Sequence, residues 1–402
     1  MMNQTDILIV GSGQAGAQAA ISLRQEGFTG SITMVGEEQD LPYERPPLSK
    51  DYLAGERTAD RLLLRPPAFW AEREIRILTS TRITHVDGGV ATADDGRQFA
   101  FGKLIWAAGG HARQLSCAGG GLGGVHSIRT RHDDDDLRAD LHTAERVVIV
   151  GGGYVGLEAA AVLVKQGKQV TVVEAQTRLL ARVAGAAVSD FYKAAHEAHG
   201  VTILLDAQVE ALEGDTRVTG VRLADGRLLP ADLVIVGIGL VPSVAPLGLE
   251  TILVDAHGRT SLPDIYAIGD CAGHANRFAG GGTIRLESVQ NAVDMAKAAA
   301  AHIVHGDGAK PYDACPWFWS NQYDLKLQTV GLSLGHDETV VRGDPATGGW
   351  SLVYLRAGAV IALDCINAPR DYVQGKALVE RGARISPALL ADTDTPLKQM
   401  EG

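Results

Sequence analysis

The chain is predicted to be an α/β protein with two parallel-sheet domains of the three-layer ββα sandwich type and a C-terminal α+β domain. An apolar strand at residues 7–10 leads into a glycine-rich turn and a helix of small residues. The same strand, turn and helix pattern returns at residues 146–158. From Pro311 onward the glycine turns give way to short apolar runs, which are typical of antiparallel strands.

The first glycine turn predicts a dinucleotide site. The strand Ile7-Leu-Ile-Val10 precedes Gly11-Ser-Gly13-Gln-Ala-Gly16, and a helix is expected to about Gln25. In this Rossmann-like pattern Gly11 allows the tight turn, Gly13 the approach of the backbone to a pyrophosphate, and Gly16 close packing of helix and strand. The amides at the helix start then face the anion.

An acidic residue after the second strand is expected to bind a ribose. The strand 31–35 ends before Glu37, the position at which a carboxylate accepts from ribose hydroxyls. A solvated loop carboxylate is the alternative. The segment 45–50 follows with two prolines; Ser49 is expected to cap a helix, and Arg45 and Lys50 are either surface charges or residues that close over the cofactor.

The rest of the first domain is predicted from short apolar runs. Strands are expected at 82–86 and 103–106, with a hairpin turn at 94–97. Much later in the chain, a buried strand at 265–268 delivers Asp270 to its carboxyl end, and residues 284–304 are expected to form a long helix.

The second copy of the pattern predicts a second dinucleotide site. The strand 146–150 leads into Gly151-Gly-Gly153-Tyr154-Val155-Gly156-Leu-Glu158, and the strand 169–173 ends at Glu174. A carboxylate there accepts from two ribose hydroxyls and repels a 2′-phosphate, and the first arginine beyond it is Arg178. The sequence therefore favours NADH over NADPH. The strand 232–236 then ends in Gly237.

Four consecutive acids at 133–136 resemble a metal site at first sight. Four neighbours on a helix cannot all face one ion, and acids at a helix start complement its dipole. We expect a solvated helix start and no metal.

Two tryptophans mark the start of the C-terminal domain. Trp317 and Trp319 point to one face if residues 316–321 form a strand. A buried core and a role at a cofactor ring or interface are both open. Further strands are expected at 325–330, 350–355 and 360–366.

Charge and cysteine usage exclude several functions. The chain has 402 residues, with 37 basic against 48 acidic residues and a net charge of −11, which argues against nonspecific nucleic-acid binding. The four cysteines have no C-x-x-C spacing, which predicts a reduced, cytoplasmic chain. The sequence contains no apolar run of about 18 residues, so no membrane span is predicted.

Two dinucleotide sites in one chain predict a redox reaction. We expect NADH to pass a hydride to a tightly bound FAD, which releases electrons singly. No cysteine precedes Cys117, so a redox thiol beside the flavin is not expected.

The motifs GSGQAG, YERPPLSK, GGGYVGLE, TVVE, IYAIGD and PWFWSNQ, in this order, resemble the NADH-dependent ferredoxin reductases of bacterial oxygenase systems, within the glutathione-reductase-like flavoprotein superfamily. The resemblance covers nearly the whole chain. It implies an FAD domain (1–112 and 242–315) split by an NAD domain (113–241), and a C-terminal interface domain (316–402). It also implies an NADH:ferredoxin oxidoreductase that serves aromatic hydrocarbon catabolism, with a [2Fe–2S] ferredoxin as acceptor feeding a ring-hydroxylating dioxygenase or a cytochrome P450.

The resemblance also implies roles for individual residues. Lys50 would lie by flavin N5 and pair with Glu158, Tyr154 would lie where the nicotinamide stacks, and Trp319 would complete the catalytic group. FAD would be held by Ser12, Gly13, Gln14, Ala15, Gly16, Glu37, Arg45, Lys50, Ile83, Arg129, Asp270, Val289, Trp317 and Trp319. NADH would be held by Gly151, Gly153, Tyr154, Val155, Gly156, Glu174, Arg182 and Gly237.

Two other classes of function stay open on the sequence. One is a flavoenzyme with another acceptor: an NADH oxidase, or a rubredoxin or monodehydroascorbate reductase. The other is a redox-responsive binding protein like apoptosis-inducing factor. Either a monomer or a homodimer is expected.

Overall fold

The computed structural model describes residues 2–401, which divide into two compact units. The first contains the chain up to Glu44, Asp60–His111 and Val241–Pro316. The second contains Arg45–Ala59, Ala112–Leu240 and the chain from Trp317 onward. Residues 113–240 and 317–401 thus fall into one unit, and the division into three domains stays a prediction.

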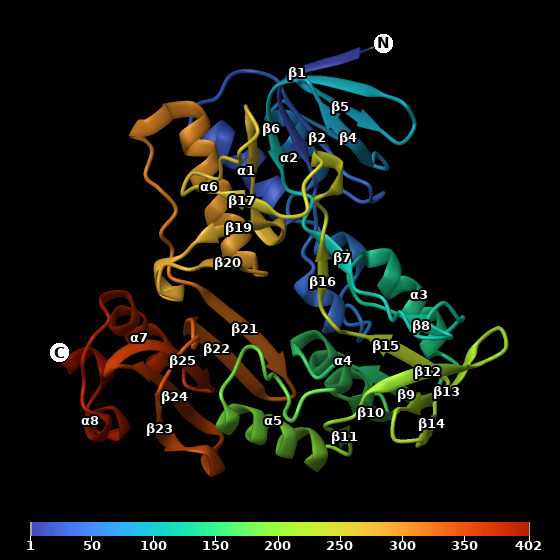
Figure 1. Cartoon of the computed structure of the whole chain (residues 1–402), viewed down its shortest axis with the longest axis vertical. Helices are drawn as coiled ribbons and strands as arrows, with labels where there is room; N and C mark the ends of the chain where they lie inside the picture. The colour runs from blue at the N-terminus through green and yellow to red at the C-terminus, as the bar shows by residue number, and fades with distance from the viewer. Residues whose placement is uncertain (1, 402) are drawn as a thin grey trace. The chain divides into compact units, whose positions relative to one another are not determined.

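A seven-stranded sheet forms the centre of the first unit, in the order β3-β2-β1-β6-β5-β4, with β18 paired to β6 (Figure 1). Parallel pairs join β1 to β2 and β6, β2 to β3, and β6 to β18, whereas β4, β5 and β6 pair antiparallel. Leu8 and Ile9 of β1 are fully buried, as expected for a strand covered on both faces. The strands are β1 (Met2–Val10), β2 (Ile32–Val35), β3 (Ile75–Leu78), β4 (Ile83–Asp87), β5 (Val90–Ala93), β6 (Gln98–Trp106) and β18 (Ile265–Ala267).

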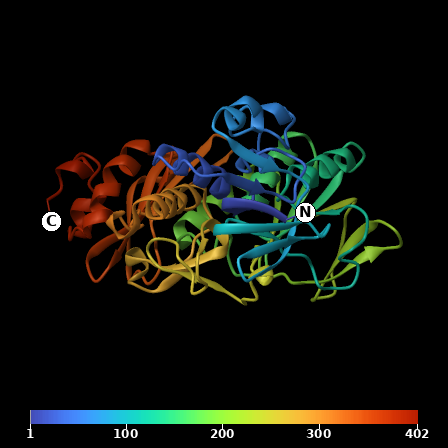
Figure 2. The same ribbon diagram turned by 90° about the horizontal axis from the view of Figure 1, so that it is seen from above.

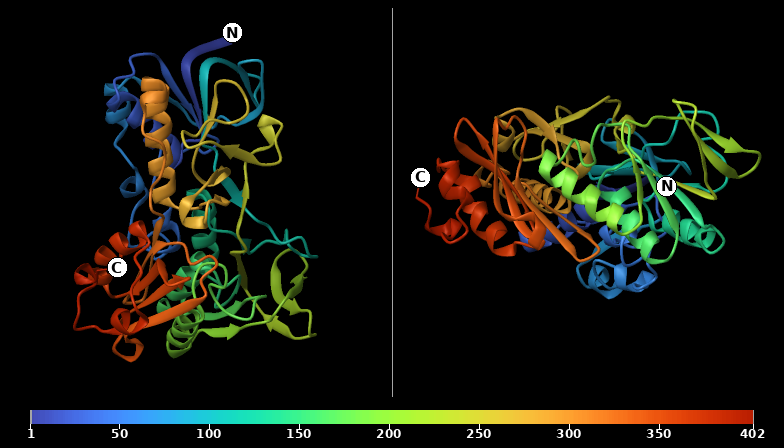
Figure 3. Two further views of the ribbon diagram at one scale, coloured as in Figure 1. Left: turned by 60° about the vertical axis from the view of Figure 1, so that its left-hand side comes forward. Right: turned by 90° about the horizontal axis from the view of Figure 1, so that it is seen from below.

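Two helices of the first unit, α1 (Gln14–Gln25) and α6 (Val289–His305), pack against each other (Figure 3). The helix predicted from residue 284 begins later because the Ser288 side chain caps it, accepting from the amide of Asn291 at 3.1 Å. Residues before the cap form β20 instead. This unit also contains α2 (Pro67–Glu72) and a three-stranded sheet of β17 (Ile252–Val254), β19 (Ala272–Ala275) and β20 (Thr283–Arg285).

The second unit contains the repeat of the parallel-sheet pattern. Its five parallel strands follow the order β11-β10-β9-β15-β8. They are β8 (Val125–His126), β9 (Arg146–Val150), β10 (Gln169–Val173), β11 (Thr202–Leu204) and β15 (Leu233–Val236), with helices α3 (Arg131–Leu141), α4 (Tyr154–Lys165) and α5 (Ala186–Ala198). An antiparallel sheet is formed by β12 (Val209–Gly214), β13 (Val218–Leu223) and β14 (Leu228–Pro230). The positions at which the chain leaves the first unit and returns to it lie in a two-stranded sheet of β7 (Gly110–Ala112) and β16 (Leu240–Pro242).

A five-stranded antiparallel sheet, in the order β21-β22-β25-β24-β23, ends the chain. Helix α7 packs against β22 and β25 (Figure 2), and α8 packs against β23. The α/β class with a C-terminal α+β part is confirmed. The elements are β21 (Trp317–Gln322), β22 (Leu325–Gly331), β23 (Glu338–Asp344), β24 (Gly349–Arg356), β25 (Ala359–Ile366), α7 (Pro369–Arg381) and α8 (Pro387–Ala391).

The acids at the start of α3 correct one expectation. Asp133 and Thr130 form a reciprocal capping box, as an acid at a helix start should. Asp134, however, is not solvated. Its side chain is fully buried, and neither carboxylate oxygen has a hydrogen-bond partner within residues 2–401. Burial raises the pKa of Asp134 to about 7, against the smaller opposing effect of Arg138.

The Asp134→Ala variant is therefore expected to be more stable than the parent protein above neutral pH. The folded state holds the Asp134 proton up to about pH 7, whereas the unfolded chain releases it near 3.8, so the stability of the parent falls as pH rises between these values. The stability that the parent loses over this pH range is on the order of 4 kcal/mol. Thermal unfolding at pH 4.5 and 8 measures the difference, with exposed Asp136→Ala as the matched control. Equal shifts in the two variants would contradict the buried-acid account.

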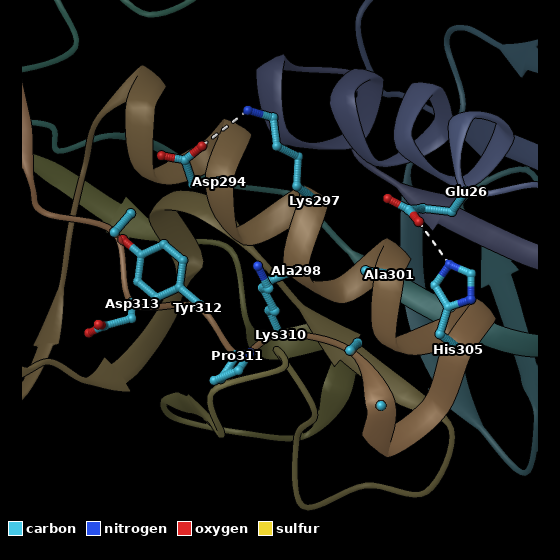
Figure 4. A pocket seen from close by; sticks show the side chains of 13 residues that line it. Glu26, Asp294, Lys297, Ala298, Ala301, His305, Lys310, Pro311, Tyr312 and Asp313 are labelled. Atoms are coloured by element: carbon cyan, nitrogen blue, oxygen red, sulfur yellow. Dashed lines mark hydrogen bonds and ion pairs between the residues drawn. The ribbon is translucent and has the colours of Figure 1, made fainter.

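A groove of about 550 Å³ lies in the first unit beside α6 (Figure 4). Two pairs of its polar side chains lie together: Lys297 Nζ lies 3.2 Å from Asp294 Oδ1, and His305 Nε2 lies 2.8 Å from Glu26 Oε2. None of the residues predicted to bind a cofactor lines it. Within residues 2–401, no helix combines the length and the apolar character that a membrane crossing requires.

Candidate active site

The first glycine turn forms a tight cradle that has no room for a side chain at Gly11 or Gly16. Gly11 has φ +108°, and a Cβ on it would lie 2.2 Å from the carbonyl oxygen of Ala107. A Cβ on Gly16 would lie 1.9 Å from the carbonyl oxygen of Gly11. Gly13 directly precedes α1, and no side chain among the described residues caps that end, so the first amides stay open to an anion. These features fit the pyrophosphate of FAD.

The other residues of the first unit predicted to bind FAD lie on separate elements. Glu37 follows β2, is exposed, and has Oε2 3.8 Å from Nε of Arg82. Asp270 lies in the short helix Gly269–Cys271 after β18, and its carbonyl oxygen accepts from Arg285 Nη1 at 2.7 Å. Ile83 is buried in β4, and Val289 is the first residue of α6.

The second glycine turn repeats this geometry. Gly151 has φ +110°, and a Cβ there would lie 2.4 Å from the carbonyl oxygen of Gly237. A Cβ on Gly156 would lie 2.3 Å from the carbonyl oxygen of Gly151. Gly153 directly precedes α4, again without a side-chain cap among residues 2–401, and Val155 in the first turn is exposed. The cradle fits the pyrophosphate of a nicotinamide nucleotide.

Glu174 lies at the end of β10 and faces the second glycine turn. Its Oε2 accepts from the amide of Gly152 at 2.6 Å, and its Oε1 accepts from the amide of Gln176 at 2.8 Å. The side chain of Arg178 is occupied elsewhere, because it donates to the carbonyl oxygens of residues 181 and 184 and to Ser189 Oγ. The nearest following arginine is therefore not available to a 2′-phosphate.

Arg182 lies beside the end of the β15 strand. Its Nη2 would be 3.8 Å from a Cβ on Gly239, two residues beyond Gly237. In the part of the chain that the structure describes, no hydrogen bond or ion pair holds this guanidinium. That Arg182 holds NADH at the second glycine turn stays a prediction.

Lys50 and Glu158 form an ion pair within the second unit. Lys50 Nζ lies 2.6 Å from Glu158 Oε2 and also donates to the carbonyl oxygen of Pro46 at 3.1 Å. The glutamate side chain is 3 % exposed and the lysine side chain 16 %. A buried carboxylate of this kind needs its full set of donors.

Sequence reasoning missed two of those donors. Ser49 Oγ donates to Glu158 Oε2 at 2.5 Å, and Ser320 Oγ donates to Glu158 Oε1 at 2.6 Å. The expectation that Ser49 caps a helix is wrong: Ser49 ends the short helix Pro46–Ser49, and its hydroxyl turns to the carboxylate instead. The sequence did contain a signal for Ser320. Because side chains alternate along a strand, Ser320 is expected on the face of the strand opposite to Trp317 and Trp319.

The strand β21 presents aromatic rings on both faces. Trp317 and Trp319 lie together with ring centroids 5.5 Å apart, which places them on one face as predicted. Both are half-buried, so neither is a core residue. On the other face Phe318 packs on Tyr154, with centroids 4.6 Å apart. Tyr154, the first residue of α4, therefore connects the second glycine turn to the C-terminal sheet.

The predicted FAD residues divide between the two units. Arg45, Lys50, Arg129, Trp317 and Trp319 belong to the second, where Arg45 Nη1 donates to the carbonyl oxygen of Arg129 at 2.6 Å. The glycine turn, Glu37, Ile83, Asp270 and Val289 belong to the first.

Comparison with known proteins identifies the family. The profile of the pyridine nucleotide-disulphide oxidoreductases matches residues 5–296, and a profile described as a reductase C-terminal domain matches residues 317–401. The chain belongs to the pyridine nucleotide-disulphide oxidoreductase family, whose members bind FAD and a nicotinamide nucleotide. Within that family it belongs with the ferredoxin reductases, which confirms the group predicted from the motifs.

Three similar proteins support the placement. A ferredoxin reductase subunit of 5,5′-dehydrodivanillate O-demethylase from Sphingobium sp. is 57% identical over 409 residues, covering 99% of each chain. A ferredoxin–NAD(P)+ reductase from Sphingomonas sp. is 54% identical over 403 residues, covering 98% of this chain and 97% of the other. The reductase in a covalent putidaredoxin reductase–putidaredoxin complex superposes with a TM-score of 0.93 at 38% identity, covering 98% of this chain and 97% of that one.

Proposed function

We propose that the protein is an NADH:ferredoxin oxidoreductase that delivers electrons to a [2Fe–2S] ferredoxin serving an oxygenase in the cytoplasm. The observation that carries the proposal is the buried Lys50–Glu158 pair, in which Glu158 follows the second glycine turn and accepts from Ser320 of the aromatic strand β21. The names of the relatives support a ferredoxin as acceptor, and the demethylase relative supports an oxygenase system.

FAD, when bound, accepts a hydride from a nicotinamide and releases electrons singly. The chain supplies two backbone cradles for phosphates, at Gly11–Gly16 and Gly151–Gly156. Lys50 supplies a positive charge that a buried carboxylate holds in one place. A preorganised charge of this kind stabilises negative charge that develops beside it, because it needs no reorganisation during the reaction. The proposed catalytic residues are Lys50, Glu158 and Trp319.

The sequence offers no thiol for a disulfide-reducing reaction at this site. No cysteine occurs before Cys117, and Cys271, Cys315 and Cys365 are all buried. We therefore assign the outgoing electrons to a protein acceptor. Cytochrome c reduction tests this: it should be fast with NADH only when a [2Fe–2S] ferredoxin is added. Fast reduction with rubredoxin alone would favour the rubredoxin reductase alternative.

The preference for NADH rests on Glu174. A ribose 2′- and 3′-hydroxyl pair can donate to its carboxylate, whereas a 2′-phosphate is repelled by it. The side chain of Arg178, the first arginine after Glu174, is occupied elsewhere and so does not offset that repulsion.

The Glu174→Ala variant is expected to bind NADH about tenfold more weakly while it keeps FAD, because it loses hydrogen bonds to a charged acceptor. The dissociation constants are measured by titrating the oxidised protein with NAD+ and with a 2′-phosphorylated analogue. The variant should discriminate less than the parent between these two nucleotides. Glu210→Ala, an exposed glutamate on β12, is the matched control. Loss of FAD with unchanged NAD+ affinity would show that the two sites are assigned in reverse.

A further inference from the structure

A chain of buried hydrogen bonds leads away from Glu158. Ser320 Oγ lies 2.6 Å from Glu158 Oε1, and Gln322 Nε2 lies 3.1 Å from Ser320 Oγ. Gln322 Oε1 lies 2.8 Å from His196 Nε2, and His196 Nδ1 lies 2.9 Å from the hydroxyl of Tyr323. The chain joins α4, β21 and α5, all within the second unit.

The charge on Glu158 fixes the direction of every bond in this chain. An ionised carboxylate has no hydrogen, so Ser320 must donate to it and must accept from Gln322. The Gln322 amide group therefore points to Ser320 and its oxygen to His196, which requires a hydrogen on His196 Nε2. His196 Nδ1 is then an acceptor, and Tyr323 donates to it. Each donor thus points toward the carboxylate.

Burial makes the arrangement rigid. Ser320 and His196 are fully buried and Gln322 is 1 % exposed, so water cannot replace a lost donor. Burial lowers the pKa of His196, against the smaller effect of Gln322, and a neutral ring is the form that can accept from Tyr323. Bonds aligned in one direction in a low-dielectric interior polarise one another.

We propose that Ser320 is a positioning residue for the Lys50–Glu158 pair. Gln322, and through it His196 on α5, hold the Ser320 hydroxyl in the position from which it donates to the carboxylate. This inference rests on the proposed role of the pair in flavin reduction. Ser49 and Lys50 bond only Oε2 of the carboxylate, so among residues 2–401 Ser320 alone donates to Oε1. Without it the carboxylate can rotate, and the Lys50 ammonium loses its fixed place.

The first test is a double-mutant cycle on single-turnover reduction of the flavin by NADH. Ser320→Ala is expected to slow reduction about tenfold, because it removes a hydrogen bond to a charged group. In a Glu158→Gln background the same change should alter the rate less than about twofold, because the carboxylate through which it acts is already gone. Ser351→Ala is the matched control. Ser351 is also fully buried in the C-terminal sheet and also donates to a carboxylate, Asp371 Oδ2 at 3.0 Å.

The second test needs no turnover, and it is read on the parent protein. Nitrogen-15 NMR of histidine-labelled holoprotein, with His196 assigned from a His196→Gln spectrum, should show hydrogen on Nε2 and none on Nδ1. A hydrogen on Nδ1 would overturn the proposed direction of the chain. Equal effects of Ser320→Ala in both backgrounds would overturn its action through Glu158 and leave the proposed function intact. Unchanged reduction in Glu158→Gln itself would overturn the role of the pair, and the inference with it.

Discussion

Replacement of Lys50 by methionine is expected to slow reduction of the bound flavin by NADH about 100-fold, a loss typical of removing a preorganised charge from an active site. The effect should lie in the limiting rate rather than in NADH affinity, because Lys50 pairs with Glu158 and has no place in the second glycine cradle. Anaerobic stopped-flow measurement of the flavin absorbance over a range of NADH concentrations separates the two.

The same variant is expected to lose about 3 kcal/mol of unfolding free energy, because it leaves the charge of Glu158 buried without its cation. The double variant Lys50→Met/Glu158→Gln should recover part of that stability but none of the rate. Lys193 and Glu197 offer a matched control: their ion pair has a similar length, 2.7 Å, but is exposed, so Lys193→Met should cost less than about 1 kcal/mol. A normal limiting rate in Lys50→Met would remove lysine from the mechanism.

Replacement of Gly16 by alanine is expected to abolish FAD retention. The added Cβ would lie 1.9 Å from the carbonyl oxygen of Gly11, so the turn must open or α1 must move away from β1. Either movement destroys the backbone cradle proposed for the pyrophosphate. The purified variant should be colourless, with a flavin-to-protein absorbance ratio at least about tenfold below that of the parent.

Gly308→Ala is the control for that experiment. Gly308 lies in the same unit, and a Cβ there meets no heavy atom of the described chain within 4 Å. This variant should keep its full flavin content. A yellow Gly16→Ala protein with normal flavin content would show that FAD does not bind at the first glycine turn.

Features set by local chemistry could be predicted from the sequence. The two glycine turns are examples, because tight backbone approach allows only glycine at Gly11 and Gly151. The buried strands β1 and β9 are continuous apolar runs, and such runs predict buried strands whatever the rest of the chain contains. The tryptophan pair on β21 follows from strand alternation alone.

Features set by distant contacts could not be predicted in this way. Ser320 reaches Glu158 from 162 positions away along the chain, and no local pattern records such a contact. The strand β23 was missed because it is an edge strand whose residues are mostly exposed, and β5 was missed because its four residues, Val-Ala-Thr-Ala, are too short a run to predict a strand. Asp134 resembles its three acidic neighbours in sequence, and only packing against the core distinguishes it.

The central claim is that electrons pass from NADH through this chain to a ferredoxin. Sequential-mixing stopped-flow tests it directly: the oxidised holoprotein is first reduced anaerobically with NADH and then mixed with a [2Fe–2S] ferredoxin or with oxygen. The account predicts rapid flavin reduction by NADH, slower reduction by NADPH, and rapid reoxidation by ferredoxin with two ferredoxins reduced per NADH. Rapid reoxidation by oxygen together with no electron transfer to ferredoxin would contradict it.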